Sequence, residues 1–355
     1  MEKIKIAVVG VGSISNMHIK GYLASGKAEL YAFCDINEKR LQYMGEKYGV
    51  TRLYTDEAEM LRALPEIDAV SVCTWNSAHA PCTIMALDAG KHVICEKPMA
   101  TTVEDAEAML EAAKRNNKLL MIGFVRRFGT DADAVSTLMK NNRLGEVYYA
   151  KAQYLRRNGA PGGWFGDKSR SGGGPLIDLG VHVIDLVRYL VGRPNPVSVY
   201  GATFDKLGDR RHIQTGKVHV SSDASVTEDI FDCEDLATAL IRFDNGMVLA
   251  VETSFSLNIG KGSGDIYLFG DKSGVRIGSE VEIYGETDGY LSDTSLGKST
   301  GLNFDTVFNV EIRHFLDCID GTETVCRAPA EDGVALMKIL TAIYRSAESG
   351  HEVTL

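Results

Sequence analysis

A glycine-rich turn between an apolar strand and a helix constrains the fold of this chain more than any other feature. The apolar segment Ile4–Val9 runs directly into this turn, which opens a predicted helix over residues 14–25. Gly10 permits the tight bend, and Gly12 lets the backbone approach a pyrophosphate without a Cβ in the way. The sequence of the turn is Gly10-Val11-Gly12-Ser13-Ile14-Ser15.

The same turn predicts the contacts of a dinucleotide. The backbone at Ser13 and Ile14 aims N–H groups and the positive helix end at a diphosphate. Asp35 follows about twenty residues later, at the end of the next strand, where a carboxylate accepts hydrogen bonds from a ribose diol. It also repels a 2′-phosphate, so we expect NAD rather than NADP, a preference that the nearby Arg40 softens. The third small position is Ser15, a mild departure; the alternative is a glycine turn beside a solvated aspartate.

Apolar runs and helical patterns alternate through residues 1–124, which predicts a Rossmann domain with a doubly wound parallel sheet. The helices are expected near residues 14–25, 37–48, 78–89 and 102–115, the last opening with a capping box from Thr101 to Glu104. The expected strands are Ile4–Val9, Leu30–Cys34, Ala69–Cys73, Val93–Cys95 and Leu119–Phe124.

Residues 125–355 show a different pattern and are expected to form a substrate-binding and oligomerisation domain of α+β class. Long alternating segments predict a large, mostly antiparallel open sheet, and Asp244-Asn245-Gly246 predicts a hairpin. The polar, Gly/Ser-rich segments 206–226 and 286–302 are expected to be loops. Helices are expected near residues 131–141, 304–319 and 330–348, and packing of the last one back on the first domain is compatible with this pattern. The expected strands are Val147–Leu155, Val197–Phe204, Ala237–Phe243, Met247–Phe255 and Ile266–Phe269.

Composition excludes several classes of function. The formal net charge is −10 and no run of Lys and Arg is present, so the electrostatic footprint of a nucleic-acid-binding protein is missing. We find no apolar run of membrane-spanning length and no signal-peptide pattern, so a cytoplasmic location is expected. The seven cysteines form no C-x-x-C pair, which argues for reduced thiols and against a structural zinc site. No metal is therefore expected.

The turn Glu96-Lys97-Pro98 lies just past the carboxyl end of a buried strand, where ligands bind in open α/β sheets. A partly desolvated Lys97 can hydrogen-bond a substrate oxygen and stabilise developing alkoxide charge. Pro98 restricts Lys97 to an extended conformation. An exposed loop lysine is the alternative interpretation.

An apolar helix that starts after three glycines carries the most informative polar pattern. Pro175 suits its first position, and the helix is expected to run to Val191. Asp178, His182 and Asp185 fall at i, i+4 and i+7, on one face. Asp178 can orient the His182 ring and stabilise its imidazolium form, which creates a proton acceptor and donor near neutral pH. The alternatives are a structural Asp–His pair or a metal site, and Asp185 is expected to pair with Arg188.

Weaker signals complete the candidate site. Thr74, Asn76 and His79 follow the third parallel strand and are candidates for contact with the cofactor, with a helix-capping loop as the alternative. Trp164 lies in a glycine-rich segment and is a candidate wall of the substrate pocket, or else core packing. Arg126 is a candidate for binding substrate hydroxyls or a carboxylate, with solvated surface as the default.

Taken together, these motifs resemble the glucose–fructose oxidoreductase, inositol dehydrogenase and rhizopine-catabolism family (Gfo/Idh/MocA), and the resemblance covers most of the chain. It rests on the glycine turn with Asp35, on Glu96-Lys97-Pro98 and on the motif that runs from Gly172 to His182. The resemblance implies that Lys97, Asp178 and His182 match catalytic positions. It also implies a cofactor role for Glu96 and Lys97, and the Lys97–Pro98 turn is similar to one where the family often has a cis peptide. A homodimer or homotetramer formed through the open sheet face is implied as well.

Three functions are compatible with these residues. The first is NAD-dependent oxidation of a secondary alcohol of a sugar, inositol or related polyol, in which His182 takes the hydroxyl proton and Lys97 steadies the oxygen. The second is an NAD-requiring glycoside hydrolase that works by transient oxidation and elimination. The third is a non-catalytic, cofactor-sensing regulator, which has little need for Lys97, Asp178 and His182 together.

Overall fold

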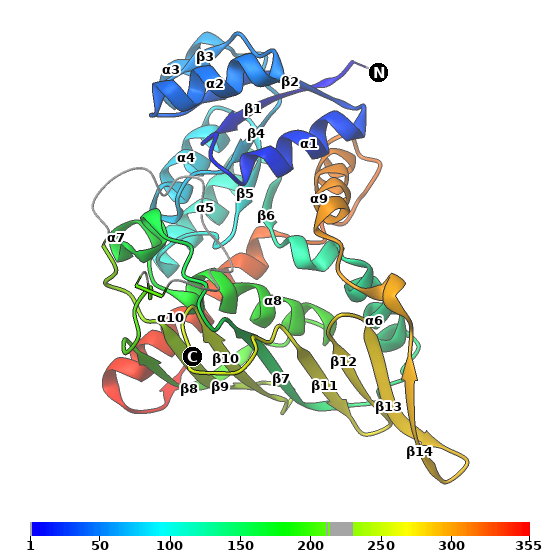
Figure 1. The fold of residues 1–355 in the computed structure, drawn as a ribbon. Helices are drawn as coiled ribbons and strands as arrows, with labels where there is room; N and C mark the ends of the chain where they lie inside the picture. The colour runs from blue at the N-terminus through cyan, green and yellow to red at the C-terminus, as the bar shows by residue number, and fades with distance from the viewer. Residues whose placement is uncertain (1, 211, 214–229) are drawn as a thin grey trace. The chain divides into compact units, whose positions relative to one another are not determined.

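The structure is a computed structural model, and it describes residues 2–210, 212–213 and 230–355. Most of the expected loop 206–226 lies outside these described residues. The chain divides into two compact units (Figure 1): unit 1 is Met1–Val125 with Phe304–Met337, and unit 2 is Arg126–Asn303 with Lys338–Leu355. None of the helices in the described part of the chain is long and apolar enough to cross a lipid bilayer.

Unit 1 contains a six-stranded sheet whose order is β3-β2-β1-β4-β5-β6, with every paired strand parallel. This confirms the predicted Rossmann fold, because the strand order reverses at β1, where the glycine turn lies. The sequence analysis missed the two-residue strand β3 and the short helix after it. The elements are β1 (Ile4–Val9), α1 (Ser15–Ser25), β2 (Ala28–Cys34), α2 (Glu38–Tyr48), β3 (Leu53–Tyr54), α3 (Glu57–Ala63), β4 (Ala69–Val72), α4 (Asn76–Asp88), β5 (His92–Glu96), α5 (Val103–Asn116) and β6 (Leu120–Gly123).

The cap of helix α5 lies one residue later than the sequence indicated. Thr102, not Thr101, is the N-cap, and its hydroxyl accepts a hydrogen bond from the backbone N–H of Asp105 at 3.1 Å. The expected capping box between Thr101 and Glu104 was therefore wrong. The adjacent threonines offer the same cap chemistry to the sequence, and the backbone decides between them.

Helix α9 (Phe304–Ile319) belongs to unit 1, although the sequence analysis placed every residue after 124 in the second domain. It packs along α1, and the two helices lie side by side in Figure 1. Gly21 makes this approach possible, because a Cβ at this position would lie 2.8 Å from Cβ of Ile312. Helix α10 (Ala330–Ser349) spans both units, since its residues up to Met337 belong to unit 1.

Unit 2 is built on a nine-stranded sheet with the order β14-β13-β12-β11-β7-β10-β9-β8-β15. Only β10 and β7 pair in parallel, which confirms the predicted mostly antiparallel open sheet. The Asp244-Asn245-Gly246 turn joins β9 to β10 as expected, with Gly246 at φ +84°. The strands are β7 (Val147–Leu155), β8 (Pro196–Phe204), β9 (Leu236–Phe243), β10 (Val248–Ser254), β11 (Ile266–Gly270), β12 (Gly274–Ile277), β13 (Val281–Thr287), β14 (Tyr290–Ser295) and β15 (Val353–Thr354).

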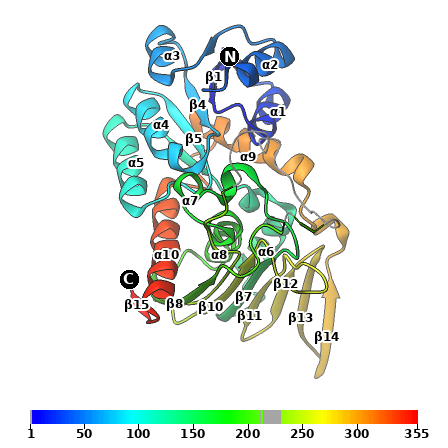
Figure 2. The same cartoon turned by 60° about the vertical axis from the view of Figure 1, so that its left-hand side comes forward.

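The two faces of this sheet differ sharply, as strand alternation requires. Helix α8 (Val181–Leu190) packs on β7 and β11, and Figure 2 shows α8 and α6 (Thr130–Lys140) together on one face of the sheet. A register row on the covered face is almost wholly apolar and buried: Val199, Ile241, Leu249, Ala150, Leu268 and Val275. The neighbouring row on the opposite face mixes apolar and charged residues: Tyr200, Leu240, Ala250, Lys151, Tyr267, Arg276 and Glu282.

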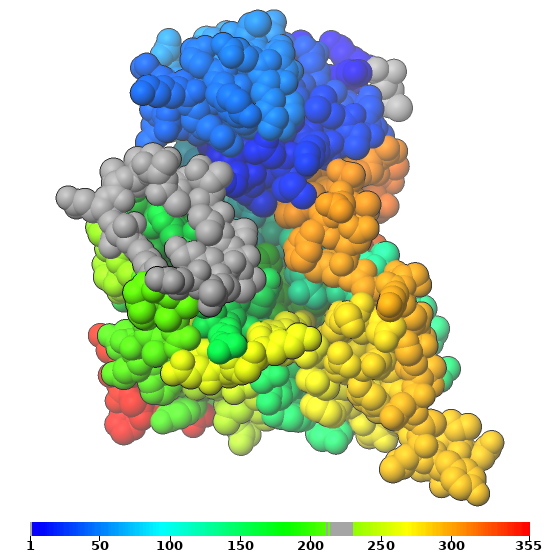
Figure 3. Space-filling view, viewed as in Figure 1, coloured from blue at the N-terminus to red at the C-terminus, as the bar shows by residue number. Residues whose placement is uncertain are grey.

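The prediction of a loop over residues 286–302 was wrong, because most of this segment is regular secondary structure. Strands β13 and β14 form a hairpin whose turn residues Asp288 and Gly289 have φ of +52° and +82°. Figure 3 shows the tip of this hairpin projecting beyond the neighbouring strands, and Leu291 there is 94% exposed. An edge hairpin that faces solvent can be polar, so its composition resembled that of a loop, although Asp-Gly is itself a hairpin signal.

The packing of α1 on α9 gives a prediction with an unusual sign. Gly→Ala in a helix interior ordinarily stabilises by about 1 kcal/mol. Gly21→Ala should instead destabilise the protein by roughly 1–3 kcal/mol, because its Cβ overlaps Ile312 and the helices must separate. Denaturant unfolding measures the change, and the exposed Lys20→Ala on the same helix is the control. Stabilisation by Gly21→Ala would show that α9 does not pack on α1 in this way.

Candidate active site

The glycine turn has the geometry of an anion-binding loop. Gly10 has φ +81°, and a Cβ there would lie 2.7 Å from the carbonyl carbon of Cys73, so only glycine fits. Helix α1 begins without a side-chain cap at Ile14 and without an acidic residue in its first turn. Its positive end is therefore available to a diphosphate, which is what a bound dinucleotide presents. The hydroxyl of Ser15 donates to the Gly12 carbonyl at 2.8 Å and so links the first residue of α1 to the loop.

Asp35 and Arg40 both form hydrogen bonds with the backbone of this loop. The backbone N–H of Val11 donates to the Asp35 carboxylate at 2.7 Å, and Asn37 N–H donates to its other oxygen at 2.8 Å. Arg40 donates to the carbonyls of Val11 at 2.8 Å and Gly12 at 3.3 Å. The guanidinium of Arg40 is thus engaged by the loop itself. This arrangement fits an NAD site, where a half-exposed Asp35 faces a diol rather than a phosphate.

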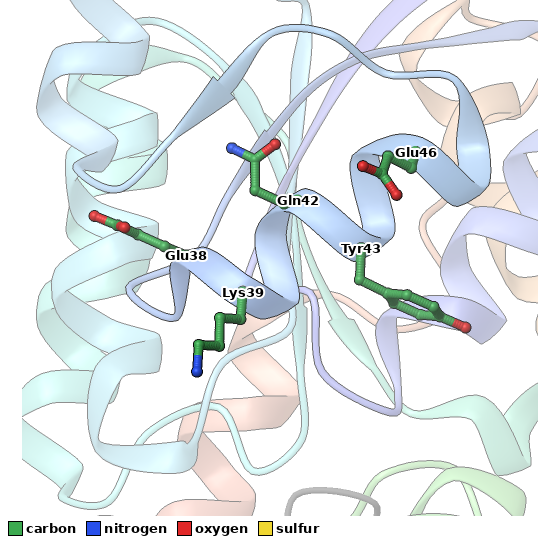
Figure 4. A pocket seen from close by; sticks show the side chains of 5 residues that line it. All are labelled: Glu38, Lys39, Gln42, Tyr43 and Glu46. Atoms are coloured by element: carbon green, nitrogen blue, oxygen red, sulfur yellow. The ribbon is translucent and has the colours of Figure 1, made fainter.

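A pocket on α2 lies close to Asp35 in the sequence but does not form a reaction site. Figure 4 shows that its lining side chains all come from one helix, and each of them is exposed. Tyr43 lies beneath the cations of Arg40 and Lys47, at 5.6 and 5.9 Å from its ring centroid. A single helix face encloses too little space to exclude water from a reaction. The lining residues are Glu38, Lys39, Gln42, Tyr43 and Glu46.

The turn after β5 holds Lys97 in a defined backbone geometry. Lys97 is half-exposed, and its peptide bond to Pro98 is cis. The backbone N–H of Lys97 donates to one oxygen of the Glu96 carboxylate at 3.1 Å. The other oxygen lies 2.8 Å from Nε2 of His18, a residue of α1 that is completely buried. Burial raises the pKa of Glu96, but the hydrogen bond and charge of His18 outweigh it and the pKa is lowered overall.

A second buried histidine holds the other end of this turn. Nδ1 of His79 lies 2.7 Å from the carbonyl oxygen of Pro98, and its Nε2 lies 3.2 Å from the carbonyl oxygen of Thr74. Burial lowers the pKa of His79 despite these two carbonyls. A neutral ring donates only one N–H, and the shorter distance favours Pro98 as its acceptor. His79 therefore ties α4 to the lysine turn, and Asn76 is buried at the start of the same helix.

One more carboxyl lies in the same buried region of unit 1. Glu311 on α9 is completely buried, and neither of its oxygens has a hydrogen-bond partner within the described part of the chain. Burial and then the negative charge of Glu96 raise the pKa of Glu311 well above its usual range. Sequence reasoning missed both His18 and Glu311. Each lies at the spacing of the buried face of its helix, and a polar residue at such a position is the signal that could have found them.

Unit 2 positions the polar helix through its glycines. A Cβ at Gly173 would lie 2.1 Å from the Tyr344 hydroxyl, and one at Gly174 would lie 2.1 Å from the Glu234 carbonyl. The buried Glu234 carboxylate accepts from the N–H groups of Gly174 at 2.9 Å and Leu176 at 3.2 Å. Tyr344 donates to it at 2.9 Å. This carboxylate caps the helix start, where the helix dipole favours negative charge.

The helix itself starts with a π-turn, η3 (Leu176–Gly180), and continues as α8. From Leu176 to Arg188 every residue is buried except Asp178 and His182, which are half-exposed. The expected end is close, because α8 ends at Leu190 and Gly192 has φ +90°. π-turns within helices occur frequently at functional sites. The two residues that the sequence predicts to carry proton chemistry are therefore the ones that the packing leaves accessible.

Asp185 has a partner that the sequence analysis did not name. Arg127 donates to both oxygens of its carboxylate, at 2.9 and 2.6 Å, and both side chains are buried. The expected pairing with Arg188 rests on helical spacing and stays a prediction, and Arg188 also donates to the carbonyl of Pro194 at 3.0 Å. Asp185 is a structural residue that anchors α8 to the segment before α6.

The remaining candidates also lie in unit 2. Arg126 donates to Asp131 at 3.0 Å, so its charge is partly neutralised. Trp164 is half-exposed and stacks on Phe165, with ring centroids 4.0 Å apart. The predicted site is thus divided between the units: the dinucleotide loop and Lys97 in unit 1, and Arg126, Trp164, Asp178 and His182 in unit 2.

Comparison with known proteins identifies the family. Residues 4–124 match the domain described as "Oxidoreductase family, NAD-binding Rossmann fold", and residues 137–355 match the C-terminal alpha/beta domain of the same family. The chain belongs to this oxidoreductase family. The resemblance stated from the motifs is therefore confirmed, and so are the NAD cofactor and the oxidoreductase class of the enzyme.

Individual relatives agree with this assignment. The chain is 35% identical to a D-glucoside 3-dehydrogenase of Escherichia coli (strain K12), covering 99% of this chain and 97% of that protein. It is 29% identical to a myo-inositol 2-dehydrogenase of Thermotoga maritima over 71% of this chain and 68% of that protein. A structure of levoglucosan dehydrogenase in complex with NADH has the same fold, with a TM-score of 0.85 at 22% identity and 99% coverage of both chains.

The buried Glu311 of this family member gives a pH-dependent prediction. Its pKa is raised in the folded protein, so its contribution to stability is present below the unfolded value of about 4.3 and is lost as the pH rises toward the folded value. Glu311→Gln removes this linkage. At pH 7 the variant should be more stable than wild type by roughly 1–3 kcal/mol, because folding of the wild type then requires proton uptake by a carboxyl that is ionised in the unfolded chain, at about 1.4 kcal/mol per pH unit.

Denaturant unfolding between pH 4 and pH 8 measures this difference, which should shrink toward zero at the acidic end. The exposed Glu331→Gln on α10 is the matched control and should show no such trend. A Glu311→Gln variant that is less stable than wild type at pH 7 would show that the carboxylate is ionised and paired.

Proposed function

We propose that this enzyme oxidises a secondary ring alcohol of a sugar or glycoside, with NAD as the hydride acceptor. The observation that carries the proposal is the pair Asp178 and His182, half-exposed on a helix that is otherwise buried. Similarity over nearly the full length to a D-glucoside 3-dehydrogenase supports a hexoside as the first substrate to try. The inositol and anhydrosugar dehydrogenases among its relatives act on related ring alcohols.

In this proposal the protein's side chains accept the proton of the substrate hydroxyl and stabilise the negative charge that develops on its oxygen. His182 takes the hydroxyl proton, and Asp178 stabilises the imidazolium that results. Lys97 donates to the same substrate oxygen and stabilises the developing alkoxide. The bound nicotinamide supplies the hydride acceptor. Glu96, His18 and His79 act indirectly, because they fix the turn that presents Lys97.

The remaining residues bind the two ligands. The backbone at Ser13 and Ile14 binds the diphosphate, and Asp35 binds the ribose diol, with Thr74 and Asn76 near the nicotinamide half. Trp164 offers an apolar surface to one face of a sugar ring. Arg126 donates hydrogen bonds to substrate hydroxyls with the N–H groups that Asp131 does not use.

Replacement of His182 tests the reaction directly. His182→Ala should lower kcat/KM for the best sugar or glycoside by about 10²- to 10⁴-fold, the usual contribution of a general base. The readout is NADH absorbance across a panel of glucosides, hexoses and inositols, with NAD binding measured separately. His351→Ala, at an exposed histidine near the C-terminus, is the control and should leave turnover unchanged. Unchanged turnover in His182→Ala, or release of aglycone without NADH, would contradict the proposal.

We further propose that two copies of the chain associate through the open face of the nine-stranded sheet. Tyr200 and Leu240 are directly paired on β8 and β9 and are 52% and 50% exposed. Apolar side chains on an exposed sheet face favour burial against another apolar surface. In a symmetric dimer the same face of a second copy supplies that surface. Leu240→Glu should shift the molar mass measured by light scattering toward that of the single chain. The exposed Leu23→Glu on α1 is the control, and an unchanged mass in Leu240→Glu would exclude this face.

A further inference from the structure

Three soft-metal ligands gather in unit 1 at a place that the proposed reaction does not use. His314 and Cys318 lie on α9, and Cys326 lies in the segment that follows it. One potential ligand atom from each residue lies within 4.8 Å of the other two, and all three residues are half-buried. The four-residue spacing of His314 and Cys318 places both on one face of the helix.

The distances suit a tetrahedral ion. Nε2 of His314 and Sγ of Cys318 are 3.5 Å apart. Zinc binds thiolate at about 2.3 Å and imidazole at about 2.0–2.1 Å, so two such ligands at a tetrahedral angle lie about 3.6 Å apart. The observed distance between Nε2 of His314 and Sγ of Cys318 therefore already matches the distance expected when both atoms bind one ion. Two sulfurs and one imidazole select zinc and similar borderline ions over magnesium or calcium.

The position of the cluster gives an ion a structural effect. The segment after α9 runs beside β6, the edge strand of the parallel sheet: Ile122 N–H donates to the Ala328 carbonyl at 3.0 Å, and Met121 pairs with Pro329. Cys326 lies two residues before Ala328. A bond from Cys326 to an ion on α9 would therefore fasten the segment that covers the open edge of the Rossmann sheet.

We propose that His314, Cys318 and Cys326 bind one divalent ion of the zinc class, with a fourth position left for water. The backbone N–H of Arg327 now donates to Nε2 of His314 at 2.9 Å, and the ion replaces this hydrogen bond. The expectation of no metal rested on the absence of a C-x-x-C pair. That pattern does not detect a site that combines a helical His-x-x-x-Cys with a cysteine from the next segment.

Cobalt titration of the full-length, reduced and chelator-washed protein tests the proposal. Co²⁺ bound by thiolates gives charge-transfer absorption, and the titration should end at one ion per chain. Zn²⁺ should displace it and raise the thermal unfolding temperature. Cys318→Ser, Cys326→Ser and His314→Ala should each weaken Co²⁺ binding by at least about 100-fold, since even outer-shell partners are worth 10- to 100-fold. Cys82→Ser, at a half-buried cysteine on α4, should bind Co²⁺ as the wild type does.

The outcomes separate this site from the proposed reaction. Circular dichroism and NAD binding confirm that each variant is folded, and the cobalt absorbance does not depend on turnover. Absence of thiolate-to-cobalt absorption in the reduced wild type would overturn the proposal, as would equal binding by Cys326→Ser. Formation of a Cys318–Cys326 disulfide on oxidation, with no ion bound by the reduced protein, would also overturn it and identify a thiol pair instead.

Discussion

The hydrogen bond between His18 and Glu96 is the interaction on which the dinucleotide-binding unit depends. A carboxylate that is almost completely buried is costly unless it is paired. His18 supplies the pair from α1, at 2.8 Å, and the same carboxylate then accepts the N–H of Lys97 at 3.1 Å. One buried charge thus links the helix that follows the glycine turn to the turn that carries the lysine. The two sequence motifs are separated by some eighty residues but share one hydrogen-bonded group.

In unit 2, buried charged groups likewise hold a predicted site segment in place, here the polar helix. Its polar helix starts at a buried carboxylate, Glu234, and is anchored by the buried pair of Arg127 and Asp185. Because these charges are satisfied inside the unit, the helix is fixed in rotation. Asp178 and His182 are then the positions left half-exposed. The π-turn contributes here, since its wider turn changes the angular positions of the side chains around the helix.

The features that sequence reasoning found are local ones. Apolar runs and turn residues predicted most strands, and the glycine turn predicted the cofactor. The contacts that it did not find lie between distant segments. Arg127 lies 58 residues from Asp185, beyond the reach of helical spacing. The place of α9 in unit 1 depends on Gly21, and nothing near residue 304 encodes that contact. The β13–β14 hairpin was predicted as a loop for another reason: an edge strand exposed to solvent has no apolar period to detect.

Glu96 and Glu311 show why the partner matters more than burial itself. Both carboxyls are buried in unit 1, and the charge of Glu96 contributes to the raised pKa of Glu311. His18 bonds Glu96 and lowers its pKa, whereas Glu311 has no hydrogen-bond partner among the described residues and its pKa rises. A lowered pKa favours the charged form of Glu96, the group that accepts the Lys97 N–H, and a raised pKa favours the neutral form of Glu311. The hydrogen bond from α1, and not the degree of burial, therefore accounts for the difference between the two carboxyls.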